Sequence, residues 1–149
     1  MKVSLSLLQE AKSYLCWDVF PGLAMQLVPI ENTTAWYFPP EKELDRIFVF
    51  YRDDAKSLAE ALFYLFHEAG HLVQKQSFEQ NRDMHEFQKM LELDRGARKA
   101  AFEQQAWALG EPLLERYLHT RDIDPITLLD PYRDLAVQSV SSYLDPESI

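Results

Sequence analysis

The spacing of hydrophobic and polar positions divides the chain into a mixed first third and a helical remainder. Residues 4–15 carry leucine and alanine at helical intervals, which predicts an amphipathic helix. Strand-like patterns follow over 23–30, 34–38 and 46–51. The last of these, RIFVFY, has the highest aromatic and β-branched content and is the strongest strand signal in the chain.

From residue 55 onward the pattern is helical. Asp53 and Asp54 are suitable N-cap residues for a helix from about Ala55 to Gln76. Further helices are expected over 83–95, 97–119 and 131–144, with a break or kink in the second at Gly110–Pro112. The sequence therefore predicts an α+β fold, in which a small three-stranded sheet packs on a mainly helical body as a single domain, residues 1–149.

The composition of the chain excludes several classes of protein and of binding partner. A content of 47% hydrophobic residues excludes a disordered chain, and a formal net charge of −9 argues against nucleic acid as a general partner. The lone Cys16 has no partner for an internal disulfide. The apolar run near the N-terminus is too short to span a bilayer and makes a poor signal peptide. We therefore expect a cytoplasmic protein with no membrane partner.

The segment FHEAGHL carries the strongest chemical signal. His67 and His71 are four positions apart, so on a helix both imidazoles face the same side and can bind one metal ion. Glu68 lies about 100° round the helix, where it suits a general base better than a third ligand. The alternative is a buried helix with a satisfied histidine pair, since the H-E-x-x-H pattern arises by chance in roughly one such chain in a hundred.

Catalytic zinc usually has three protein ligands, so a third is required. His85 is one candidate, but its polar neighbours favour a surface position. Glu103 is the stronger candidate, because Ala100, Ala106 and other small residues around it would let its helix lie close to the histidine helix. The alternative for Glu103 is an ordinary surface glutamate.

FHEAGHL, followed by EQQAWALG, resembles the ImmA/IrrE-type metallopeptidases, a gluzincin-like family with an H-E-x-x-H helix and a downstream E-x-x-A helix. The resemblance runs from about residue 4 to 118, and its specific part is confined to 46–71 and 100–110. It implies a zincin-like body, zinc bound by His67, His71 and Glu103, and Glu68 as the catalytic base. Many relatives also carry a DNA-binding helix-turn-helix module, for which 149 residues leave no room.

These observations predict a zinc-dependent peptidase that hydrolyses peptide bonds of a protein or peptide substrate, with a specific intracellular target implied by the resemblance. The alternative is a metal-containing regulatory or partner-binding protein without hydrolytic activity. The oligomeric state is open. Strand 46–51 could bind substrate as an added strand if it lies at the sheet edge. Four residues are candidates to stabilise the developing oxyanion, although ordinary structural roles are favoured for each of them: Tyr117, His119, Tyr132 and Arg95. Asp130 and Asp134 could accept a hydrogen bond from the ligand imidazoles, but helix capping is the favoured role for both.

Overall fold

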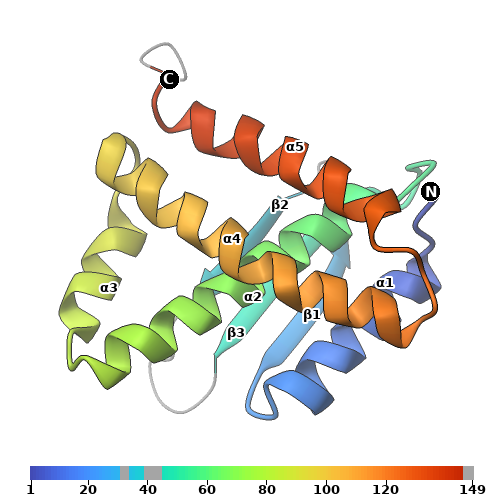
Figure 1. Ribbon diagram of the computed structural model, residues 1–149, viewed down its shortest axis with the longest axis horizontal. Helices are drawn as coiled ribbons and strands as arrows, with labels where there is room; N and C mark the ends of the chain where they lie inside the picture. The colour runs from blue at the N-terminus through green and yellow to red at the C-terminus, as the bar shows by residue number, and fades with distance from the viewer. Residues whose placement is uncertain (31–33, 39–44, 146–149) are drawn as a thin grey trace.

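The computed structural model describes residues 1–30, 34–38 and 45–145, and it confirms the α+β class. Figure 1 shows the layers: the sheet lies behind helix α2, and helices α4 and α5 lie in front of α2. A single hydrophobic cluster includes residues from the sheet and from all five α-helices. None of the described helices is long and apolar enough to cross a membrane.

The sheet contains the three predicted strands, β1 (Ala24–Pro29), β2 (Thr34–Phe38) and β3 (Arg46–Tyr51). Their spatial order is β1-β3-β2, with β1 parallel and β2 antiparallel to β3. The strand 46–51 is therefore central, and the suggestion that it offers a free edge to substrate is wrong. Its alternate residues Ile47, Val49 and Tyr51 are buried, while aromatic residues occupy the opposite face.

The helical body follows the predicted order with shifted ends. Helix α1 (Leu5–Ser13) continues as a π-helical segment η1 (Tyr14–Val19), and α3 (Met84–Glu92) is shorter than expected. Helix α4 (Ala97–Thr120) runs without the expected break at Gly110–Pro112. Helix α5 (Ile126–Ser142) begins five residues before Pro131, because the Asp124 carboxylate accepts a hydrogen bond from the Ile126 N–H at its first turn.

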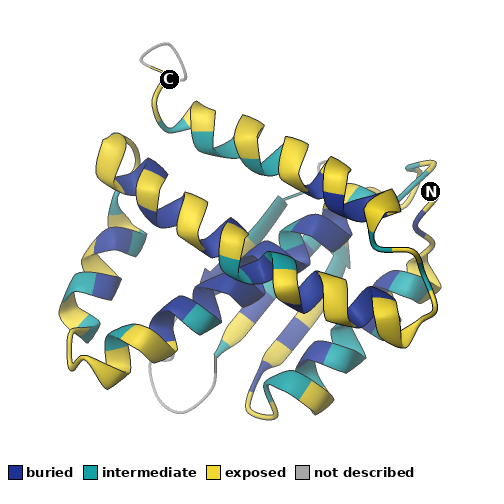
Figure 2. Cartoon of the chain, viewed as in Figure 1, coloured by how far each residue is buried: buried dark blue, intermediate teal, exposed yellow. Residues whose placement is uncertain are grey.

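Helix α2 (Ala59–Gln80) begins later than expected and extends further. Asp54 does not cap it, because its carboxylate pairs with the Arg52 guanidinium. The Ser57 hydroxyl instead accepts hydrogen bonds from Ala59 N–H and from Val3 N–H, which ties the chain start to the start of α2. Figure 2 shows that α2 is buried around its middle, where the sheet and α4 cover it.

Candidate metal centre

The buried middle of α2 carries the H-E-x-x-H motif. His67, Glu68 and His71 have relative exposures of 5%, 6% and 4%. Three polar side chains buried within one helical turn require partners, because desolvation is costly without hydrogen bonds or a metal. Helix α4 contributes neighbours to both histidines, because Trp107 stacks on His67 and Phe102 stacks on His71.

Glu103 on α4 reaches both histidines. Its Oε2 lies 3.1 Å from His67 Nε2 and 3.2 Å from His71 Nε2, and its residue exposure is 4%. Neighbouring ligands of a tetrahedral zinc with bonds of roughly 2.0–2.1 Å are about 3.3 Å apart, so these two distances fit ligands of one ion. The three donor atoms all lie within 4.8 Å of one another. The same distances also suit hydrogen bonds between the rings and the carboxylate.

Glycine permits this approach of α2 and α4. A Cβ on Gly70 would lie 2.8 Å from the Ala106 carbonyl carbon and 3.0 Å from Gly110 N. A Cβ on Gly110 would lie 2.6 Å from the Tyr132 hydroxyl and 2.9 Å from the Phe66 carbonyl carbon. The two helices thus touch backbone to backbone beside the candidate ligands, which confirms the close approach expected from the small residues around Glu103.

Each imidazole is held by different neighbours. His71 Nδ1 lies 2.7 Å from Gln74 Oε1, and the Gln74 amide donates to Phe102 O at 2.8 Å. This leaves Nε2 of His71 directed at Glu103. The His67 ring stacks on Trp107 with centroids 4.3 Å apart, and its Nδ1 has no hydrogen-bond partner among the described residues.

Asp130 and Asp134, the two alternative acceptors for the imidazoles, do not take that role. Asp130 and Asp134 are exposed, and Asp130 pairs with the Arg133 guanidinium. Gln74 takes that role for His71, and its position three residues after the histidine, on the same helix face, was the signal available in the sequence.

Glu68 points toward the same cluster without completing it. Its Oε1 is 3.9 Å from His67 Nε2, and the carboxylate forms no hydrogen bond with another described group. Burial raises the pKa of Glu68 above its usual value, an effect opposed by the nearby His67 and His71. A carboxylate that forms no hydrogen bond with the described groups and is more basic than usual is suited to accept a proton.

The ligand groups shift one another's pKa in opposite directions. Burial alone would raise the pKa of Glu103, but hydrogen bonds from His67 and His71 outweigh it and hold that pKa far below the usual range. Burial alone would lower the pKa of His71, and the Glu103 hydrogen bond and the charge of Glu68 together raise it. In the absence of metal, the Glu103 carboxylate is therefore ionised and stabilises the protonated, positively charged form of the His71 ring.

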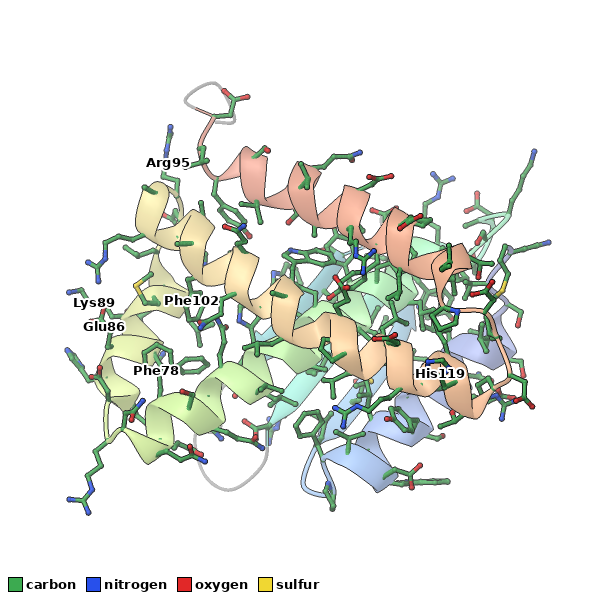
Figure 3. The ribbon with its side chains drawn as sticks, viewed as in Figure 1. Phe78, Glu86, Lys89, Arg95, Phe102 and His119 are labelled. Atoms are coloured by element: carbon green, nitrogen blue, oxygen red, sulfur yellow. The ribbon has the colours of Figure 1, made fainter. Side chains whose placement is uncertain are left out.

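The other candidates lie away from this cluster. Figure 3 shows Arg95 and His119 at opposite ends of α4, and His85 on α3 is exposed, as expected of a surface histidine. The Tyr117 hydroxyl donates to Leu7 O, and the Tyr132 hydroxyl donates to Trp107 O. Those hydroxyls are engaged in structural hydrogen bonds, so neither tyrosine is placed to stabilise an oxyanion.

Two residues near the ligands were missed in the sequence. Lys99 Nζ lies 2.8 Å from Glu103 Oε1, and its position four residues before Glu103 could have indicated this pair. Tyr143, near the end of α5, lies with its ring 5.8 Å from Lys99 Nζ. Burial and the charges of Glu103 and Glu68 raise the pKa of the Tyr143 phenol, so it remains a hydrogen-bond donor at neutral pH. No sequence pattern linked α5 to the histidine helix.

The donor set fits zinc. Two imidazole nitrogens and one carboxylate oxygen are a combination found in catalytic zinc sites, which keep a fourth position open. The chain matches no family model, no curated protein and no solved structure. The functional interpretation therefore depends on the geometry of His67, Glu68, His71 and Glu103.

Proposed function

We propose that this protein is a zinc-dependent peptidase that cleaves peptide bonds of a specific intracellular protein. The observation that carries the proposal is the convergence of His67, His71 and Glu103 beside Glu68, a buried carboxylate with no hydrogen bond to another described group. A purely structural zinc site would be closed by four protein ligands and would need no such base. The resemblance to ImmA/IrrE-type metallopeptidases supports the same assignment.

The roles of the residues follow from their positions. When bound, zinc supplies a Lewis acid that polarises a carbonyl group and makes water nucleophilic near neutral pH. His67, His71 and Glu103 hold the ion, and Gln74 fixes the orientation of His71. Glu68 accepts the proton from the attacking water and returns it to the departing amine, so the carboxylate ends as it began.

An edge of the sheet lies close to this cluster. Strand β2 packs against α2, and its Tyr37 ring lies nearly parallel to the His71 ring with centroids 6.3 Å apart. Within the described residues, β2 pairs only with β3, so its other edge is free of strand partners. An extended peptide could add to this edge by main-chain hydrogen bonds, with its scissile bond toward the ligands.

Metal binding is the first test. The purified protein is expected to bind about one zinc per chain. Glu103→Ala should lose most of that affinity, because one of the three ligands is removed. His85→Ala is the control and should bind as the unaltered protein does. Loss of metal in His85→Ala but not in Glu103→Ala would refute the ligand assignment.

Glu68→Gln separates an enzyme from a metal-containing regulatory protein. The substitution preserves size, so zinc content and the fold should change little. Peptidase turnover should fall by about 10²–10⁴, the usual contribution of a positioned acid–base group. The measurement is complementation of a deletion strain, together with a comparison of which cellular proteins persist uncleaved. Full complementation by zinc-loaded Glu68→Gln would favour the partner-binding alternative.

A further inference from the structure

Lys99 is a buried lysine beside the candidate ligands. It lies in the first turn of α4 with 6% relative exposure. Its ammonium group donates to Glu103 Oε1 at 2.8 Å, to Met90 O at 3.3 Å and to Leu91 O at 3.2 Å. An ammonium has three N–H donors, so all three are used. The Phe102 and Tyr143 rings lie 5.5 and 5.8 Å from Nζ.

This arrangement gives the two oxygens of Glu103 different partners. Oε2 faces the Nε2 atoms of His67 and His71, while Oε1 is held by Lys99. A carboxylate can bind a metal through one oxygen or through both. Binding through both would require Oε1 to leave the ammonium group, which would leave a buried charge without its partner.

We propose that Lys99 is a positioning residue that keeps Glu103 a one-oxygen ligand and so limits the metal to four ligands, namely two imidazoles, one carboxylate oxygen and a water at the open position. The inference rests on the metal site of the proposed function. It names Lys99 as a residue that sets how many ligands the metal has. Lys99 itself touches neither metal nor substrate. It acts on the reaction through the orientation of Glu103.

Helix α3 fixes the lysine in turn. Met90 and Leu91 belong to the last turn of α3, where carbonyl groups have no partners within the helix and the helix dipole attracts cations. Lys99 satisfies two of these carbonyls. The end of α3 is thereby connected, through one side chain, to a ligand on α4.

Cobalt substitution tests the inference without measuring activity. Cobalt(II) in a four-coordinate site absorbs visible light more strongly than in a five-coordinate site, so its spectrum reports coordination number. Three cobalt-loaded proteins should be compared: the unaltered chain, Lys99→Met and Lys75→Met. Lys75 is the matched control, because it is similarly buried at 8% exposure and ion-paired, but with Asp45 and Glu79.

The unaltered protein and Lys75→Met should show the strong absorption of four-coordinate cobalt. Lys99→Met should bind the ion but absorb more weakly, because the second Glu103 oxygen is then free to become a fifth ligand beside the water. Its peptidase turnover should also fall by about 10–100-fold, the usual effect of losing an outer partner of a ligand. An unchanged cobalt spectrum in Lys99→Met would overturn the inference and leave the proposed function intact.

A second measurement needs no variant. In a crystal structure of the zinc-loaded protein, Glu103 Oε2 should lie about 2.0–2.2 Å from zinc while Oε1 remains with Lys99. Two Glu103 oxygens bound to zinc would refute the role of Lys99 alone. Failure of the unaltered protein to bind zinc or cobalt would refute both this inference and the metal site on which it rests.

Discussion

Gly70→Ala should damage both the fold and the metal site, although it adds only one methyl group. Carbon atoms in contact prefer a separation of about 3.5–4.0 Å, whereas the new Cβ would lie 2.8 Å from the Ala106 carbonyl carbon. It would also meet Gly110 N at 3.0 Å. The Ala106 carbonyl oxygen would be closer still, and all three neighbours are backbone atoms, so α2 and α4 must separate by at least about 1 Å to relieve the contact.

That separation acts directly on the ligands. Gly70 immediately precedes His71, and Ala106 lies one turn after Glu103. Zinc sites tolerate deviations of roughly 0.2 Å in ligand distance, so a shift of about 1 Å would remove Glu103 from the ion or distort the whole set. Zinc affinity should fall by more than the roughly 10–100-fold typical of losing an outer partner.

The same substitution should lower the free energy of unfolding. In an open helix, alanine is about 1 kcal/mol more favourable than glycine, but overpacking costs about 1–3 kcal/mol and occasionally more. We expect net destabilisation, measured by urea unfolding of the metal-free protein. Gly22→Ala is the control, because no atom lies within 4 Å of its Cβ, and it should change stability by less than about 0.5 kcal/mol. A Gly70→Ala protein with unaltered stability and zinc affinity would refute the reasoning.

Two further predictions concern the surroundings of the ligands. Gln74→Leu should lower zinc affinity about 10–100-fold, because His71 Nδ1 and Phe102 O lose their hydrogen-bond partner. Affinity is measured by competition with a chromophoric chelator, and a value equal to that of the unaltered protein would contradict this prediction. The pKa values of Glu68 and His71 are raised from usual values of 4.5 and 6.5, so the stability of the metal-free protein should fall as pH rises from about 5 to 8. With excess zinc, the free energy of unfolding should instead rise with pH, because zinc binds neutral imidazole. Urea unfolding at several pH values, in chelator and in zinc, provides the comparison. Parallel pH profiles would argue against metal binding at His71.

The element types and the convergence of His67, His71 and Glu103 were predictable because each has a local signal. Helical spacing places His67 and His71 on one face, and small residues around Glu103 indicate a close helix contact. The order of the strands is a tertiary property, and strand 46–51 proved central. The apolar character of both faces of RIFVFY was the available hint, since a strand covered on two sides needs no alternation.

Helix ends were predicted less well because distant contacts decide them. Ser57 rather than Asp53 or Asp54 lies at the start of α2, since its hydroxyl also binds Val3 N–H from the beginning of the chain. Helix α4 continues past Pro112 because Trp107 before it and Leu113 and Leu114 after it are buried in the same core. Such packing outweighs the loss of one hydrogen bond within the helix.

The separation of His71 and Glu103 along the chain has a consequence for folding order. They are 32 positions apart, so closing the segment between them costs about 3 kcal/mol of chain entropy, beyond a constant term. In the unfolded chain, the histidine pair could offer at most two ligands, and neither would be held in place. In the proposed metal site, complete coordination would therefore come after α2 and α4 have docked, and the fraction of bound ion that resists a chelator would measure the fraction of molecules that have finished folding.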